Sequence, residues 1–442
     1  MKRPMHRKLL VIIGTIAAFV SAASGQPAPP GNKPDVTLGS TPDTVVWGYI
    51  SSRTPPVLRI KSGTTVRIDT MSHQGLTTNA DPVTYFGRAG IKPEEVLQDA
   101  KDIYAKVPRG KGLGVHVLTG PIYVEGAEPG DALEVRVLDL EFRVPYGVNN
   151  TGPGSGVLPD LVPTSSPRVI KTDPQRKVAF LPGGIELPLG PFLGIMAVAP
   201  PPDLIVASSG PPNKWAGNLD LKVLGVGSTL YIPVFNEGAL FFTGDPHGVQ
   251  GDGEVDGGAL EQSLTGTLQF ILHKGAGKAM RWPRAEDATN YYTLGLDVDL
   301  NIAMKEAVRE AVELLQAKAG VTAAEAYAIA SMGVDFRVAE AVDSMLLIYG
   351  VVPKKFFQAE PRVLGGQVTA RNQHGRSSRY THPPMRAGSW PTIELQTINF
   401  QWRRLPLVRA SSALVRGLFG GVHTPGAQSS QTAKQRSSVK SG

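Results

Sequence analysis

Short runs of alternating apolar and polar residues, separated by Gly and Pro, recur along the first two thirds of the chain. A period of two is typical of half-buried strands. The runs predict strands over these residues: 45–50, 56–60, 63–69, 115–124, 130–136 and 227–235. Three of them begin with a turn glycine, at Gly63, Gly130 and Gly227, which suggests several β-units built in a related way. The pattern therefore favours a protein dominated by β-structure.

The apolar period changes to 3.6 residues towards the end of this pattern. Residues 299–319 place Leu, Ala, Met and Val on one face, as an amphipathic helix does. Thr322 and Glu325 have the spacing of a capping box and predict a second helix to residue 331, and residues 335–343 are expected to begin a third. A short helix is expected over residues 91–103 and a long loop over residues 147–167. The predicted fold class is α+β and mostly β, with packed β-sandwich or barrel units and a C-terminal α/β segment.

These patterns divide the chain into six predicted segments. The mature protein is expected to hold two β-rich domains, an α/β segment and a basic tail that lacks a packing pattern. The boundaries are as follows: signal peptide 1–25, Pro-rich leader 26–43, first β-rich domain 44–167, second β-rich domain 168–272, α/β segment with helices 273–360, and a tail expected to be disordered 361–442.

The first 25 residues have the organisation of a secretory signal peptide. Residues 1–8 are basic, residues 9–20 are apolar, and Ala-Ser-Gly precedes Gln26 as a small-residue cleavage site. The apolar run is short for a membrane span, so a periplasmic or secreted protein is expected, with an uncleaved anchor as the alternative. The chain has no Cys, which excludes disulfides, Cys-ligated metals and thiol nucleophiles.

The net charge of +7 is unevenly distributed. Residues 1–26 carry +4 and residues 361–442 carry +11, which leaves −8 for residues 27–360. The central part is therefore acidic, and the high isoelectric point is no argument for nucleic-acid binding. For the basic tail, contact with a membrane surface is the alternative to disorder.

The densest group of candidate chemistry lies in residues 243–254, Thr-Gly-Asp-Pro-His-Gly-Val-Gln-Gly-Asp-Gly-Glu. The segment follows the predicted strand at residues 227–235, and its Gly and Pro content predicts a loop. Polar residues on a loop at the end of a rigid strand often bind or catalyse. A solvated hairpin turn is the alternative. The candidate residues are Asp245, His247, Gln250, Asp252 and Glu254.

Four histidines lie outside the two termini, and three of them stand at predicted strand ends. These three are His73, His116 and His247, whereas His273 is expected to be an ordinary strand residue. Imidazole with carboxylate is the ligand set that hydrolytic zinc favours. No His-Glu-x-x-His spacing is present, so such a site has to be assembled from distant segments. The alternative for each histidine is a hydrogen-bonding role at a strand end.

Other catalytic signatures are absent from the sequence. It contains no Gly-x-Ser-x-Gly elbow, no Walker loop and no Gly-x-Gly-x-x-Gly on a strand–helix unit. Residues 252–257 are similar to the start of a calcium loop, but Ser263 replaces the Glu expected at the last position. An EF-hand is therefore not predicted.

Residues 244–254 resemble the signature of the acetamidase/formamidase family. Residues 116–131, 217–220 and 283–295 resemble further family segments in the same order, and the resemblance spans roughly residues 44–352. It implies hydrolysis of small amides to an acid and ammonia, with a divalent metal, expected to be Zn²⁺. Two features depart from the family pattern. Val-Asp-Gly-Gly at residues 255–258 replaces Cys-Gly-Thr, and the tail beyond residue 360 has no counterpart.

The resemblance leads to a hypothesis for the role of each candidate residue. His73, His116 and His247 are assigned as the metal-ligand pool, with Asp245 or Asp220 supplying a carboxylate. Glu254 is predicted to be the general base that later protonates the leaving nitrogen, and Glu125 is the alternative. The residues predicted to hold the substrate are Gln250, Asn218 and Asp252.

The predicted function is an exported, metal-dependent hydrolase of small carboxamides such as formamide and acetamide. One alternative is a hydrolase of a larger amide or a lactam, which a roomier pocket around residues 256–258 would permit. Another is a secreted β-rich binding protein of the same fold without turnover. The expected partners are a small amide and further copies of the same chain, and no nucleic acid.

Overall fold

The computed structural model describes residues 33–77, 80–110 and 113–357. The predicted signal peptide, the first part of the leader and the basic tail lie outside these residues, so the statements about them stay predictions. Among the described residues, no helix is long and apolar enough to cross a membrane.

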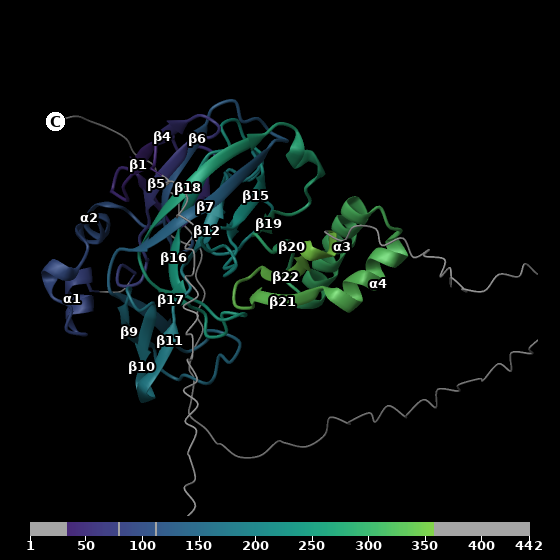
Figure 1. The fold of residues 1–442 in the computed structure, drawn as a ribbon. Helices are drawn as coiled ribbons and strands as arrows, with labels where there is room; N and C mark the ends of the chain where they lie inside the picture. The colour runs from purple at the N-terminus through teal and green to yellow at the C-terminus, as the bar shows by residue number, and fades with distance from the viewer. Residues whose placement is uncertain (1–32, 78–79, 111–112, 358–442) are drawn as a thin grey trace, which may run out of the picture. The chain divides into compact units, whose positions relative to one another are not determined.

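A nine-stranded sheet combines strands from the beginning and the end of the described sequence (Figure 1). Its neighbouring strands are antiparallel except for the first pair, which is parallel. In spatial order the strands are β1 (Val36–Leu38), β5 (Thr65–Asp69), β18 (Leu264–His273), β7 (Ala132–Phe142), β15 (Thr229–Pro233), β19 (Arg284–Glu286), β20 (Asn290–Asp297), β22 (Leu346–Pro353) and β21 (Asp335–Glu340).

An eleven-stranded sheet carries the candidate site. The order along its main path is β11 (Ile185–Pro188), β10 (Val178–Leu181), β9 (Ser166–Asp173), β8 (Tyr146–Thr151), β17 (Leu260–Glu261), β16 (Phe241–Val249), β12 (Phe192–Ala197) and β14 (Ala216–Asn218). β6 (Val117–Val124) also pairs with β16, and with β2 (Val45–Trp47) and β4 (Leu58–Ile60). A separate two-stranded ladder joins β3 (Tyr49–Ser51) and β13 (Val206–Ser208).

The main hydrophobic core is formed by side chains of both large sheets. Leu133 and Leu268 of the nine-stranded sheet and Leu118 and Phe241 of the other are fully buried in one cluster. The Phe241 ring contacts the Phe270 ring edge-on at 4.9 Å between centroids, which joins the two sheets directly. Burial of apolar side chains between sheets is the main stabilising term in such a fold. The predicted class, mostly β with packed sheets, is confirmed.

The helices lie in two groups. α1 (Pro82–Gly87) and α2 (Gln98–Lys106) follow β5, whereas α3 (Leu300–Ala319) and α4 (Ala323–Gly333) pack beside β20 and β22 (Figure 1). Asp299 caps α3, and Thr322 and Glu325 form the predicted capping box of α4. Four short 3-10 turns complete the described elements: η1 (Pro93–Glu95), η2 (Pro182–Gly184), η3 (Ala276–Ala279) and η4 (Lys354–Phe357).

Several local predictions are wrong. Residues 335–343 do not begin a helix, because Asp335–Glu340 alternates in burial and pairs with β22 as strand β21. Residues 243–249 are not a loop, because they form a buried central strand, β16, between β12 and β6. The expected helix at residues 91–103 begins later, at Gln98, after the turn η1.

Two further segments are more ordered than their composition indicates. The Pro-rich leader contains a strand, because β1 pairs with β5 and Leu38 enters the core. The long loop expected at residues 147–167 is shortened by β8 and β9 at its two ends. The predicted domain boundaries at residues 167 and 272 stay a prediction, and each large sheet takes strands from both sides of residue 167.

Gly295 of β20 allows α3 to lie close to the sheet. A Cβ atom at this position would lie 2.1 Å from Ala303 O and 2.2 Å from Ala307 N. We predict that Gly295→Ala lowers the free energy of unfolding by about 1–3 kcal/mol or more, because the helix backbone would have to move away. Chemical denaturation measures the change. Gly190→Ala is the control, since that Cβ would meet no atom within 4 Å. Equal stability of the two variants would contradict the packing argument.

Candidate metal centre

Asp245 and six other buried side chains lie close together, and the seven come from six segments of the chain. They are His73, His116, Asp220, Asp245, His247, Glu254 and Glu261, and we call them the His–carboxylate cluster. β16 supplies Asp245 and His247, and it pairs with β12, β6 and β17. His116 immediately precedes β6, and Glu261 lies opposite His247 in the register of β16 and β17. The strand pairing therefore brings together residues that are far apart in the sequence.

The two carboxylate oxygens of Asp245 face different histidines. Asp245 Oδ1 lies 3.7 Å from His73 Nδ1 and 3.6 Å from His116 Nε2. Asp245 Oδ2 lies 3.1 Å from His247 Nε2. The His73 and His116 rings also meet edge-on, with their centroids 5.0 Å apart. All three histidines predicted as ligands therefore surround one carboxylate.

Glu261 provides a second carboxylate that reaches more than one histidine. Its Oε1 lies 3.3 Å from His247 Nε2, and its Oε2 lies 3.9 Å from His73 Nδ1. Asp220 Oδ1 lies 3.8 Å from the same His247 nitrogen. Glu254 completes a group with Asp220 and His247 whose ligand atoms all lie within 4.8 Å of one another.

Each histidine uses its other ring nitrogen for a hydrogen bond outside the cluster. His116 Nδ1 lies 3.0 Å from Ser209 Oγ, and His73 Nε2 lies 3.1 Å from the side-chain amide of Gln74. His247 Nδ1 donates to Gln250 Oε1 at 3.0 Å, which turns Nε2 towards the carboxylates. Outer partners of this kind fix the ring orientation of histidines that bind metals.

The backbone is strained where it delivers three of the acids. Asp220, Asp245 and Glu254 have φ values of 43°, 52° and 45°, in the left-handed region that side-chain-bearing residues rarely adopt. Gly194 of β12 leaves space for two of them. A Cβ atom there would lie 2.5 Å from both Asp220 Oδ1 and Asp245 Oδ2. Bringing the carboxylates together therefore requires unfavourable backbone conformations at three residues and a glycine in a central strand.

Burial and mutual repulsion raise the pKa of two of the acids. The pKa of Asp220 lies well above its usual value because the residue is buried and faces Glu254 and Asp245. Burial also raises the pKa of Glu254 well above its usual value, and Glu261 adds to the effect although His247 opposes it. Burial therefore favours the protonated form of both carboxyls in the protein without bound ions.

The pKa shifts of Asp245 and His247 favour the charged form of both side chains. Burial opposes ionisation of Asp245, but His116 and His247 outweigh it and hold its pKa well below the usual value. Burial likewise opposes the charge on His247, but Glu261 and Asp245 raise its pKa well above the usual value. The pKa of His116 is lowered by burial, which its attraction to Asp245 offsets only in part.

The chemistry of the cluster fits a divalent metal. Five of its buried donor atoms have no hydrogen-bond partner: His73 Nδ1, His247 Nε2, Asp220 Oδ1, Asp245 Oδ1 and Glu261 Oε2. Buried polar atoms are normally paired, and a divalent ion could satisfy this group of unpaired ones. Three overlapping sets of ligand atoms are close enough to hold one: His73, His116 and Asp245; Asp220, His247 and Glu254; and Asp245, His247 and Glu261.

The structure places the other sequence-predicted residues outside this cluster. Glu125 is exposed in the turn after β6, so the structure does not bring it to the cluster as an alternative base. Asp252 accepts a hydrogen bond from Tyr349 Oη and pairs with Lys222 at 3.1 Å. Gln250 binds His247 through its oxygen and two backbone carbonyls through its nitrogen, so its side chain orients His247 and has no donor left for a substrate.

Asn218 lies beside the cluster in β14 with one side-chain atom unused. Its Nδ2 donates to Asp343 Oδ2 at 2.8 Å, and its buried Oδ1 has no partner. This arrangement is compatible with its predicted contact to an amide nitrogen. Asp343 itself was not predicted, and burial raises its pKa to about 7.

Sequence reasoning missed Glu261 and Ser209. Glu261 follows Glu254 by seven positions and lies beyond the glycine-rich segment of residues 243–254. Residues 260–264 read Leu-Glu-Gln-Ser-Leu, in which Gln262 interrupts the alternation of apolar and polar residues that would have marked a strand. Ser209 has no signal either, because it becomes a partner of His116 only through tertiary packing.

Fold and site together define a class of protein, two packed β-sheets that hold a buried His–carboxylate centre. A sequence profile described as the Acetamidase/Formamidase family matches residues 98–210 and 205–359, which is more than half of the chain. The chain belongs to this family.

Two relatives of this family illustrate the extent of the similarity. The chain is 28% identical to an acetamidase of Mycolicibacterium smegmatis over 219 residues, which is 36% of this chain and 54% of the relative. It is 30% identical to a formamidase of Methylophilus methylotrophus over 206 residues, which is 34% of this chain and 49% of the relative. The matched segment spans about half the length of these relatives.

Solved structures extend the similarity over most of the described fold. A predicted acetamidase/formamidase from Thermoanaerobacter tengcongensis has a TM-score of 0.60 and 25% identity, covering 73% of this chain and 96% of that one. An acetamidase from Yersinia enterocolitica has a TM-score of 0.62 and 26% identity, covering 74% and 95%.

Two raised acid pKa values predict how stability depends on pH. Burial raises the pKa of Glu340 to about 8 and that of Asp343 to about 7, whereas both are near 4 when the chain is unfolded. Between about pH 5 and about pH 8 the folded protein holds protons that the unfolded chain has released, so the free energy of unfolding falls as the pH rises. His247 acts in the same direction, and His116 opposes it.

Thermal denaturation of the full chain in a chelating buffer measures this slope. The melting temperature is expected to fall between about pH 5 and about pH 8. Glu340→Gln should flatten the fall, because the neutral amide replaces the protonated acid. A melting temperature that rises over this range would contradict the assignment.

Proposed function

We propose that the protein is a metal-dependent hydrolase of small carboxamides, which releases ammonia and a carboxylic acid. The observation that supports this most directly is the set of unpaired buried donor atoms around Asp245 in a member of this family. The substrates of the acetamidase and formamidase relatives indicate the class of amide, and the predicted signal segment supports export to the periplasm or the medium.

The cluster would hold the metal through three imidazoles and several carboxylates. His73, His116 and His247 with Asp245 form the centre, and Asp220 and Glu261 supply further oxygens. Imidazole and carboxylate together suit Zn²⁺, which we propose as the ion. A bound divalent ion supplies Lewis-acid chemistry, since it polarises an amide carbonyl and makes water a stronger nucleophile near neutral pH.

Glu254 is the proposed proton-transfer residue. A cation bound in the cluster would favour the ionised form of this buried carboxyl, so that Glu254 could accept a proton from water and then donate it to nitrogen. Water adds to the carbonyl carbon, its proton passes to Glu254, and Glu254 protonates the leaving nitrogen as the C–N bond breaks. The unpaired Oδ1 of Asn218 would accept a hydrogen bond from the amide N–H and orient the leaving group.

Removal of divalent ions tests the role of the metal. The purified full chain is expected to contain at least one equivalent of metal and to release ammonia from formamide or acetamide. Stripping with a chelator should abolish turnover and lower the melting temperature, and Zn²⁺ should restore both, because an ion that binds only the folded state stabilises it. Elemental analysis, an ammonia assay and thermal denaturation are the measurements. Full turnover by a metal-free sample would disprove the metal requirement.

Two substitutions separate the proton-transfer role from the metal-binding role. Glu254→Gln should reduce kcat by about 10²–10⁴-fold and retain metal, since loss of a general base has effects of this size. His247→Ala should lose both metal and turnover. Glu125→Gln is the matched control, because Glu125 is exposed and outside the cluster.

The outcomes of these assays also decide between the alternatives. Unchanged kcat in Glu254→Gln would exclude the proposed proton transfer. A folded protein that holds metal but releases no ammonia from short amides would favour a larger amide or lactam as substrate, or a binding protein.

A further inference from the structure

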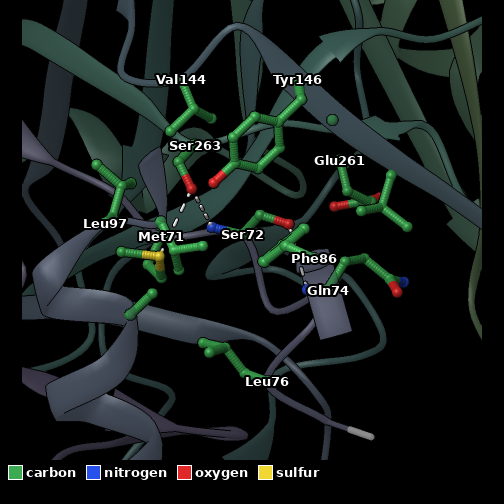
Figure 2. A pocket seen from close by; sticks show the side chains of 14 residues that line it. Met71, Ser72, Gln74, Leu76, Phe86, Leu97, Val144, Tyr146, Glu261 and Ser263 are labelled. Carbon is green, nitrogen blue, oxygen red and sulfur yellow. Dashed lines mark hydrogen bonds between the residues drawn. The ribbon is translucent and has the colours of Figure 1, made fainter. Parts of the chain in front are cut away.

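A small cavity lies directly against the cluster, and the proposed mechanism makes no use of it. It has a volume of about 20 Å³. Its walls come from the chain after β5, from α1 and α2, and from the start of β8 (Figure 2). About 10–15 Å³ of such space admits one water molecule, so the cavity has room for a group of one or two non-hydrogen atoms.

The cavity meets the cluster at one side. Glu261 belongs to both, and Ser72 and Gln74 on the cavity wall flank His73 in the chain. Glu261 Oε2 lies 3.9 Å from His73 Nδ1, so an occupant of the cavity is next to the atoms that would hold the metal. Figure 2 shows Glu261, Gln74 and Phe86 among the side chains that line the cavity.

Most polar groups on the wall already have partners within the protein. Ser263 Oγ accepts from Ser72 N at 3.1 Å, Ser72 Oγ accepts from Gln74 N at 3.2 Å, and Tyr146 Oη donates to Glu95 O at 3.1 Å. Apolar side chains form most of the remaining surface, from Met71, Leu76, Phe86, Val96, Leu97, Ala100, Val144 and Val148, and Glu261 is the one charged residue of the wall. A cavity with this lining favours an apolar occupant over a polar one.

We propose that this cavity receives the acyl group of the substrate, and that Leu97 and Ala100 determine which acyl groups fit. The inference rests on the proposed amide hydrolysis. With the amide carbonyl at the cluster beside Glu261, the substituent on the carbonyl carbon enters the cavity. A methyl group fills the space, formamide leaves it empty, and longer or branched chains meet α2. Acetamide is therefore the preferred substrate, and Leu97 and Ala100 are its specificity-determining residues.

Two substitutions that change the cavity in opposite directions test this assignment. Leu97→Ala enlarges it, and Ala100→Val fills it from within α2. The matched control for Leu97→Ala is Leu314→Ala, which truncates another half-buried leucine on α3, away from the cavity. The measurement is kcat/KM of the metal-replete full chain for formamide, acetamide, propionamide and butyramide, followed by ammonia release.

Leu97→Ala is expected to raise the ratio of butyramide to acetamide turnover roughly tenfold or more, the usual effect of methylene-sized space in an apolar pocket. Ala100→Val should lower acetamide relative to formamide by a similar factor. Leu314→Ala should alter none of these ratios.

The outcomes separate this inference from the proposed function. If formamide and acetamide are hydrolysed but neither cavity variant shifts the ratios, the cavity assignment is overturned and the amidase proposal stands. If Leu97→Ala fails to fold, Ala100→Val alone decides the assignment in the same way. If no short amide releases ammonia from the metal-replete protein, the proposed function is overturned and the acyl-pocket assignment with it.

Discussion

Asp245 holds the site together because its two carboxylate oxygens face histidines from different parts of the chain. Oδ1 faces His73 and His116, and Oδ2 faces His247. This contact requires the central position of β16. β6 and β17 pair with successive parts of this strand and bring His116 and Glu261 to the same place. The contact also requires Gly194, because a side chain there would occupy the space of two carboxylates. The two-sheet architecture thus serves to hold one buried acid in contact with three imidazoles.

Such a centre is costly to build in a hydrophobic interior. Buried carboxylates repel one another and lose hydration, and three of the four have left-handed backbone conformations. Without an ion, the protein lowers this cost by keeping Asp220 and Glu254 protonated and by a charge on His247. An ion that satisfied the unpaired donors would remove the same cost in a different way. A bound ion would therefore stabilise the folded protein as well as supply the proposed chemistry.

The sequence indicated the residues of the cluster better than the elements that carry them. Six of its seven members were candidates, because acidic residues and histidines at strand ends or in Gly/Pro-rich segments are recognisable without a fold, and Asp220 was added by the resemblance to the family. The strand β16 was predicted as a loop, since Gly244, Pro246 and Gly248 are unfavourable in isolated strands, yet two neighbouring strands fix that backbone. The third helix was wrong because β21 has both apolar alternation and helix-forming residues, and only pairing with β22 decides between them. Glu261 was missed because cross-strand register cannot be read from one sequence.

The misassigned strand β21 explains how the C-terminal segment takes part in the site. Gly253 N donates to Ala339 O, and Ala341 N donates to Gly253 O, so the end of β21 fixes the backbone just before Glu254. Asp343, shortly after this strand, holds Asn218. The proposed acyl cavity is lined in large part by residues nearer the N-terminus, in the chain after β5 and in the helices α1 and α2. These residues share the cavity wall with Glu261. In the proposed reaction the N-terminal units would thus select the acid half of the amide, and the C-terminal segment would position the groups that act on its nitrogen. Changes in the two parts should then affect acyl preference and proton transfer separately.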